Sequence, residues 1–218
     1  MEQRRTILDV LAATDAELAH AQPDPNHRYT VDEFFHWTKR YEGRLEYEAG
    51  VITAMVGGTP AHALVIGNTT IALGRRLKKP CRLYNGDLHV HIDTADAYKH
   101  PDLAIVCTKP EAGGSMFNVR TKLNPRVLVE VLSPSTEKED RTHKFDLYQQ
   151  VPGFEEYVLI DPEMRRVETL RRAGDGGWSL MYWMGTAASA RIRSLNLDLP
   201  LSEIFDGLDK DASDVGMP

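Results

Sequence analysis

The sequence predicts a mixed α/β fold, in which a central β-sheet is flanked by α-helices. Segments with apolar residues at helical spacing are followed by short runs in which apolar residues alternate or are continuous, as in strands. The run over residues 126–132 is nearly all aliphatic, which is typical of a central strand covered on both faces. At 218 residues, 42% of them hydrophobic, the chain is long enough to bury the core that such a sheet needs.

The first two elements are predicted to be helices. Apolar residues at approximately helical spacing indicate a helix over residues 6–20, and the proline-rich cluster that follows ends it. We therefore expect residues 1–27 to form an N-terminal helical extension. Thr30 and Glu33 are spaced as a capping box, which predicts a second helix from there to about Tyr41.

A β-hairpin and a long helix are predicted next. Residues 45–48 alternate apolar and acidic side chains, and Ala49-Gly50 then turns the chain into the apolar run 51–56. After two glycines, Thr59-Pro60 has the residue types of an N-cap and a first helical position. We expect the helix that begins there to end at about Lys79.

The rest of the chain is predicted to hold most of the sheet. Alternating or continuous apolar sequence indicates strands over residues 81–84, 88–93, 102–107, 126–132, 156–160, 167–171 and 178–183. A charged helix is expected over residues 137–150, and a loop over residues 109–122. We expect residues 28–208 to form one domain and residues 209–218 to be a flexible tail.

Composition bears on the compartment and on the kind of partner. No apolar stretch approaches the roughly 20 residues of a membrane span, and no secretory apolar run follows the polar start of the sequence. Cys81 and Cys107 could pair, but we expect two small hydrophobic side chains in a reduced, cytoplasmic compartment. The formal charge of −6 disfavours DNA binding by whole-molecule electrostatics, so contacts to phosphates would depend on local clusters of Lys and Arg.

Two carboxylates in the predicted sheet point to a metal site. Glu130 lies in the middle of the buried strand, where an ionised carboxylate is costly unless it is paired or binds a cation. Asp102 begins another apolar strand, so adjacent strands could bring the two together. Like charges at close range repel unless a cation lies between them, and oxygen ligands suit Mg²⁺ or Mn²⁺. Taken alone, Glu130 could instead pair with a buried arginine, and Asp102 could cap a turn.

A lysine follows these carboxylates in the sequence. Lys144 lies four residues after Asp140 on the helix expected after the Glu130 strand. From that helix its ammonium could orient a hydroxide or stabilise a pentacovalent phosphate. The alternative is an ordinary surface ion pair between Asp140 and Lys144.

Other residues with suitable chemistry are weaker candidates. His62 lies at the start of a predicted helix, and His89 and His91 share one face of a strand. Each could bind metal or shuttle protons, although hydrogen-bonded structural histidines are commoner. Tyr148 and the three tryptophans are expected to be core residues rather than platforms for stacked bases.

The order of these residues resembles the PD-(D/E)XK restriction-endonuclease superfamily, with Pro101-Asp102, then Glu130 between two valines, then a lysine. A more specific similarity, over about residues 28–185, is to the Uma-type restriction endonuclease family, formerly a domain of unknown function. The segments that carry it are 45–50, Ala61-His62, 101–106, 128–136, Asp140 with Lys144 and Tyr148, and 156–162.

The resemblance implies a fold and a set of ligands. The fold is a restriction-endonuclease-like mixed central β-sheet flanked by α-helices, formed by the domain over residues 28–208. Asp102 and Glu130 would bind Mg²⁺ or Mn²⁺. The Val131 carbonyl would be a further ligand, and Glu46 a third acidic group.

One position departs from the superfamily pattern. The lysine expected two residues after the glutamate is Leu132 here. Strand alternation places Leu132 on the same face as Glu130, so no cation comes from that position. The family resemblance implies that Lys144 supplies it from the following helix.

These observations lead to a function and to its alternatives. We expect a Mg²⁺-dependent endonuclease that hydrolyses phosphodiester bonds, with DNA as its substrate and a homodimer as the plausible assembly for cutting two strands. One alternative is a nuclease-like nucleic-acid or protein-binding module without turnover, which the acidic net charge and Leu132 favour. Another is a structural domain with buried ion pairs, which predicts no tight binding of divalent ions.

Overall fold

The computed structural model describes residues 22–55, 57–109, 120, 122–185 and 187–208. The helix predicted over residues 6–20, the predicted tail and most of the loop over 109–122 lie outside these residues. The chain divides into two compact units. The first is formed by the described part of Met1–Gly57 with His89–His100, and the second by Gly58–Leu88 with the described part of Pro101–Pro218. The predicted boundaries after residues 27 and 208 stay predictions.

The first unit packs one helix against a small antiparallel sheet. Its elements are α3 (Val31–Thr38), β1 (Leu45–Glu48), β2 (Val51–Ala54), β4 (Val90–Ile92), the short 3-10 helix η1 (Asp93–Ala95) and β5 (Ala97–Lys99), with strand order β2-β1-β5-β4. Buried aromatic side chains fill the space between them: Tyr29, Phe34, Phe35, Trp37, Tyr47 and Tyr98. Strand β5 was not predicted from the sequence.

Local chemistry explains the elements of this unit. The capping box is confirmed, because Thr30 Oγ1 accepts a hydrogen bond from the Glu33 N–H while the Glu33 carboxylate accepts one from the Thr30 N–H. The hairpin is confirmed as well. Ala49 and Gly50 both have positive φ, 44° and 87°, as a two-residue turn between right-twisted strands requires.

The second unit is built on a mixed six-stranded sheet of order β10-β9-β8-β7-β6-β3. Its strands are β3 (Arg82–Asn85), β6 (Leu103–Val106), β7 (Val127–Val131), β8 (Glu156–Asp161), β9 (Arg166–Arg172) and β10 (Trp178–Met184). Strands β7 and β8 are parallel, and the other neighbours are antiparallel. The predicted fold class is confirmed, and every residue of β7 is buried, as expected of a central strand.

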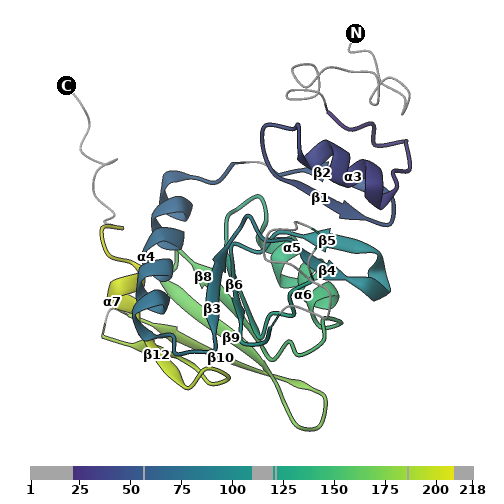
Figure 1. Ribbon diagram of the computed structural model, residues 1–218. Coiled ribbons are helices and arrows are strands. Elements are labelled where there is room, and N and C mark those ends of the chain that lie inside the picture. The colour runs from purple at the N-terminus through teal and green to yellow at the C-terminus, as the bar shows by residue number, and fades with distance from the viewer. Residues whose placement is uncertain (1–21, 56, 110–119, 121, 186, 209–218) are drawn as a thin grey trace, which may run out of the picture. The chain divides into compact units, whose positions relative to one another are not determined.

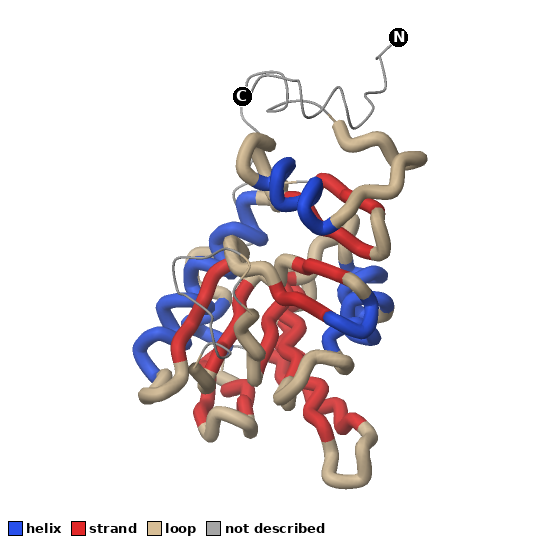
Figure 2. The backbone as a smooth tube through the Cα atoms, turned by 45° about the vertical axis from the view of Figure 1, so that its right-hand side comes forward, coloured by secondary structure: helices blue, strands red, loops and turns tan. Residues whose placement is uncertain are grey.

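Helices cover both faces of this sheet (Figure 1). The long helix α4 (Pro60–Arg76) and the short α7 (Leu201–Ile204) pack on one face together with a two-stranded sheet that was not predicted, β11 (Ser189–Ile192) and β12 (Leu197–Pro200). Figure 2 shows α4 in blue running alongside the strands. The other face carries α5 (Glu137–Arg141) and α6 (His143–Tyr148). No helix among the described residues is both long and apolar enough to cross a membrane.

The single helix predicted over residues 137–150 is wrong in one respect. The chain breaks it at Thr142, whose φ of −122° and ψ of −88° lie outside the helical region, so that α5 and α6 are separate. Apolar periodicity does not report such a break, because α5 contains only charged residues and the apolar positions of this segment all lie in α6.

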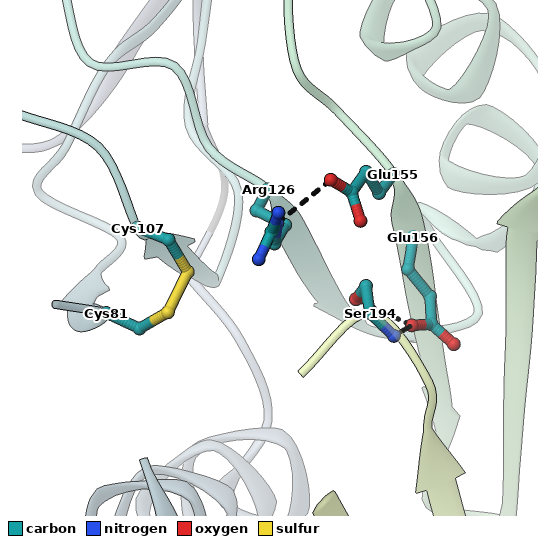
Figure 3. The surroundings of a disulfide bond; sticks show 6 residues. All are labelled: Cys81, Cys107, Arg126, Glu155, Glu156 and Ser194. Atoms are coloured by element: carbon teal, nitrogen blue, oxygen red, sulfur yellow. Dashed lines mark hydrogen bonds and ion pairs between the residues drawn. A yellow bond between two sulfur atoms is a disulfide. The ribbon is translucent and has the colours of Figure 1, made fainter. Parts of the chain in front are cut away.

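The prediction that the two cysteines are free is also wrong, because Cys81 and Cys107 form a disulfide. Strands β3 and β6 pair in antiparallel register with Arg82 opposite Val106, so the residues just outside this pair face each other. Figure 3 shows the disulfide, with Arg126 and its ion-pair partner Glu155 nearby. Spacing in the sequence could not show that the two strands are neighbours in this register.

Candidate functional site

Two carboxylates meet where the ladder between β6 and β7 ends. The last paired residues are Leu103 and Val129. At the next position along each strand, the side-chain carboxylates of Asp102 and Glu130 accept hydrogen bonds from backbone N–H groups of the neighbouring strand. The Asp102 N–H donates to Glu130 Oε2 at 3.0 Å, and the Val131 N–H donates to Asp102 Oδ2 at 2.8 Å. The structure therefore brings Asp102 and Glu130 together from adjacent strands. Asp102 is fixed by the neighbouring strand rather than serving as a turn cap.

Glu130 is held by α6 as well as by β6. Its side chain is only 3% exposed, and Oε1 accepts from Lys144 Nζ at 3.2 Å and from the Tyr148 hydroxyl at 3.0 Å. The buried partner is thus a lysine rather than the arginine considered above. Since Lys144 and Tyr148 lie one helical turn apart on the face of α6 toward the sheet, both reach the same oxygen.

Asp140 joins this cluster from α5. Its Oδ1 lies 3.1 Å from Lys144 Nζ, and the two side chains are 3% and 8% exposed. The interpretation as an ordinary surface ion pair is therefore wrong. The sequence did not mark Asp140 as a site residue, because an i, i+4 pair looks the same on a solvated helix and on a buried one.

A second ion-pair network fixes α5 against the sheet. Arg141 makes two parallel hydrogen bonds to the Glu168 carboxylate on β9, at 2.8 and 2.9 Å, and Arg166 pairs with the same carboxylate. The Tyr157 hydroxyl donates to the backbone carbonyl of Asp140 at 3.1 Å. These contacts, made by Arg141 and by the backbone of Asp140, hold α5 in place in addition to the ion pair of the Asp140 side chain.

The described residues of this cluster bring several acidic groups close together. Among the described residues, Lys144 pairs with the Glu130 and Asp140 carboxylates, and the Asp102 carboxylate lies next to Glu130. Burial raises the pKa of Glu130 well above its usual range; the charge of Lys144 opposes this shift, and the neighbouring carboxylates add to it. Burial likewise raises the pKa of Asp140. A bound cation would favour the charged forms of these carboxyl groups, which burial disfavours.

His62 lies at the same end of the sheet. Its Nε2 is 3.2 Å from Asp102 Oδ2, and its side chain is 14% exposed. The ring is directed there by the start of α4, where Thr59 Oγ1 accepts a hydrogen bond from the His62 N–H. The sequence analysis considered His62 only as a weaker candidate.

Glu46 belongs to the first unit and has partners there. Lys99, which is buried, lies 3.3 Å from Glu46 Oε2 and 3.0 Å from a Glu48 oxygen. The His100 N–H donates to Glu46 Oε1 at 3.0 Å. A lysine that the sequence analysis did not select therefore neutralises this carboxylate within its own unit.

The strand histidines of the first unit pack among aromatic rings. His91 stacks on Tyr98 with ring centres 4.2 Å apart and lies 3.4 Å from Asp93. His89 lies 4.0 Å from the His100 ring, and burial, together with the charge of His100, lowers the pKa of His89 to about 3. Neither histidine lies in a group of three potential metal ligands within the described ranges.

The donor set of the cluster fits one kind of metal. Nowhere in the described part of the chain do three or more His, Cys, Asp or Glu side chains form a group that could hold a metal ion. Mg²⁺ needs fewer side chains, because it usually keeps several waters and is bound through only one or two carboxylates. Asp102 and Glu130 provide two carboxylates within a buried cluster of net negative charge, so the residues present fit Mg²⁺ or Mn²⁺.

Replacing Tyr148 with phenylalanine tests how strongly Glu130 depends on its hydrogen bonds. We expect Tyr148→Phe to lower the free energy of unfolding by about 1–2 kcal/mol, because a buried carboxyl group loses one donor. Tyr182→Phe is the control, since that hydroxyl lies on a side chain that is 64% exposed. Urea unfolding measures both, and equal stability of the two variants would contradict the assigned contact.

Comparison with known proteins matches most of this chain to one family. A family model described as "Putative restriction endonuclease", Uma2, matches residues 31–199. Two uncharacterized proteins of Synechocystis sp. (strain ATCC 27184 / PCC 6803 / Kazusa) are similar along most of their length. Protein slr1290 is 28% identical over 192 residues, which are 88% of this chain and 98% of the relative. Protein sll1609 is 27% identical over 160 residues, 73% of this chain and 89% of the relative.

A solved structure shares the fold. The crystal structure of a putative nuclease belonging to DUF820, from Anabaena variabilis ATCC 29413, matches with a TM-score of 0.63 at 19% sequence identity. The match covers 83% of this chain and 99% of that chain. At this identity the likeness shows the common fold, which agrees with the mixed sheet described above.

Proposed function

Because the chain belongs to the Uma2 family, we propose that it is an endonuclease that uses a divalent cation to hydrolyse phosphodiester bonds in DNA. The observation that carries this proposal is the buried cluster in which the Asp102 and Glu130 carboxylates lie side by side with the Lys144 ammonium. Burying such charged groups costs stability, and clusters of this kind are common at functional sites.

The cation would be held by Asp102 and Glu130. When bound, Mg²⁺ or Mn²⁺ supplies Lewis acidity, which makes water a better nucleophile at neutral pH and neutralises charge on the scissile phosphate. The Val131 carbonyl is a further proposed ligand, at the carboxyl end of β7. Glu46 is proposed as a third acidic group; within the first unit its carboxylate is paired with Lys99.

Lys144 is proposed to position the nucleophile and to stabilise charge on the phosphate. Leu132, at the position where the superfamily has its lysine, is buried and apolar. Lys144 reaches Glu130 from α6 instead and lies between two carboxylates. The two ion pairs hold this ammonium in place while the phosphate binds.

Cation binding can be tested without any turnover. A ligand that binds only the folded state stabilises it, by about 2.7 kcal/mol at a concentration one hundred times its Kd. We expect Mg²⁺ and Mn²⁺ to raise the Tm of the wild type but not that of Asp102→Asn. Asp146→Asn, which changes an exposed carboxylate on α6, should respond like the wild type. A Tm that divalent ions leave unchanged would favour the structural-domain alternative.

A nuclease-like binding module without turnover is the second candidate, and the formal charge of −6 favours it. Incubation with nucleic acid separates the endonuclease from the binding module. The substrates are supercoiled, linear and single-stranded DNA and RNA, each with Mg²⁺ or Mn²⁺ and with EDTA. Cutting of DNA supports the endonuclease. Cation-dependent stabilisation with binding but no cutting supports the module. Sedimentation of the same samples tests whether the protein cuts as a homodimer, as we propose for double-stranded breaks.

A further inference from the structure

The start of α4 holds a histidine against one of the two carboxylates. Thr59 caps the helix through its hydroxyl, and Pro60 occupies the first helical position, so the backbone direction at His62 is set by the first turn. The imidazole is mostly buried and directs Nε2 toward Asp102 Oδ2, 3.2 Å away. Residues further along α4, among them Val65 and Leu73, pack into the hydrophobic core. His62, in the first turn of the same helix, instead contacts Asp102 at the end of the sheet.

A glycine leaves room for this ring. A Cβ added to Gly58 would overlap His62 Nδ1 and would lie 3.0 Å from Cγ of the ring. Its neighbour Gly57 is different, because an added Cβ there meets nothing within 4 Å. Several glycines of this chain have a positive φ, but Gly58 does not. The imidazole of His62, and not the backbone conformation, therefore explains why position 58 has no side chain.

The two oxygens of Asp102 are used unequally. Oδ2 receives both the Val131 N–H, at 2.8 Å, and the contact from His62 Nε2. Oδ1 has no hydrogen bond or ion pair with any residue in the described part of the chain. A carboxylate held through one oxygen by two donors from different elements has its rotation fixed, and its other oxygen stays available.

We propose that His62 is a positioning residue for the cation site: together with the Val131 N–H it holds Oδ2 of Asp102 and so leaves Oδ1 as the oxygen that binds Mg²⁺ or Mn²⁺. Partners that orient a ligand in this way contribute about 10–100-fold to metal affinity or activity. Nε2 donates to Asp102 when the ring is protonated and also in the neutral tautomer that carries its proton on Nε2, so this role does not require a charged ring. This inference rests on the proposed function and names a residue that supports its cation site.

Calorimetric titration with Mn²⁺ tests this role apart from turnover. We expect His62→Ala and Gly58→Ala to weaken Mn²⁺ binding by about 10–100-fold, the first by removing the donor and the second by displacing the ring. His62→Gln, which keeps an N–H donor, should bind Mn²⁺ more tightly than His62→Ala. Gly57→Ala is the matched control and should have the wild-type Kd.

The outcomes separate the two claims. If the wild type binds Mn²⁺ and both His62→Ala and Gly58→Ala bind it equally well, the inference is overturned while the proposed cation site stands. If the wild type itself binds no Mn²⁺, both fall. Unfolding curves in EDTA identify a variant that fails to fold. Gly58→Ala retains His62, so a change in its Kd for Mn²⁺ reports displacement of the ring and not removal of the histidine.

Discussion

The Glu130→Gln variant is expected to be more stable than the wild type in the absence of divalent ions, by about 1–2 kcal/mol at neutral pH. The reason is the charge among the described residues, where Lys144 pairs with Glu130 and Asp140 while the Asp102 carboxyl group lies next to Glu130. Glutamine has nearly the same shape, keeps an acceptor for Lys144 and Tyr148, and removes one negative charge. Its NH2 group replaces the oxygen that accepts the Asp102 N–H, and we expect the relief of repulsion between the carboxylates to outweigh the loss of that hydrogen bond. A carboxyl group that is kept for binding a cation lowers the free energy of unfolding, so we expect its replacement to raise that free energy.

The gain in stability should depend on pH with a definite sign. Burial raises the pKa of Glu130 in the folded protein above its value in the unfolded chain. A carboxyl group shifted in this direction binds its proton more tightly when folded, so the free energy of unfolding falls as the pH rises above the unfolded pKa, about 4.3. Glutamine does not titrate, and the advantage of the variant should therefore grow from acid to neutral pH.

Urea unfolding in EDTA, below and above that pKa, measures the effect. Glu139→Gln on α5 is the control, because its side chain is exposed, and it should match the wild type at both pH values. Mn²⁺ should reverse the order, since it stabilises the wild type and not Glu130→Gln. A Glu130→Gln protein that is less stable than the wild type at neutral pH would show that the site is not overcharged.

Lys144→Ala is expected to have the opposite effect on stability. Removing one partner of a buried ion pair leaves uncompensated charge and costs about 3–5 kcal/mol, and here two carboxylates lose their only described ammonium. Thermal unfolding measures this loss, and Lys138→Ala is the control because Lys138 is exposed on α5. We also expect Mn²⁺ to stabilise Lys144→Ala more than the wild type, because it replaces the missing charge.

The same variant separates structure from catalysis. At Mn²⁺ concentrations that restore its stability, Lys144→Ala should still fail to cut DNA, because the proposed role of the ammonium is to act on the nucleophile and the phosphate. If stability and cutting were both restored by Mn²⁺, Lys144 would be a structural counter-ion only.

Much of the fold follows from local chemistry. The capping box at Thr30, the positive-φ turn at Ala49-Gly50 and the Thr59-Pro60 helix start all appear where their residue types predict them. The predicted strands are observed with ends that differ by at most two residues. These elements depend on neighbours in the sequence, so the sequence contains the information that specifies them.

What the sequence did not reveal depends on distant contacts. The disulfide requires that β3 and β6 be neighbours in a given register, and the small sheet of β11 and β12 forms from short strands that need α4 and the central sheet beneath them. The break at Thr142 likewise serves the packing of two short helices. None of these has a local signature that distinguishes it from a loop or a continuous helix.

The candidate site divides in the same way. Adjacency of Asp102 and Glu130 was predictable, because a carboxylate in an aliphatic strand demands a partner and a second one begins the next apolar strand. Asp140 was missed because its ion pair with Lys144 is distinguished from a surface pair only by burial, which the sequence spacing does not show. Gly58 was treated only as a boundary between elements, yet its missing side chain gives the His62 ring its place.

The most direct test of the central claim is cleavage of supercoiled DNA by the wild type and by Glu130→Gln, with Mg²⁺ or Mn²⁺ and with EDTA. The account predicts nicked or linear products only for the wild type and only with a divalent ion, while Glu130→Gln stays folded and inactive. Equal cutting by the two proteins, or cutting by the wild type in EDTA, would contradict the claim that Asp102 and Glu130 hold the catalytic cation.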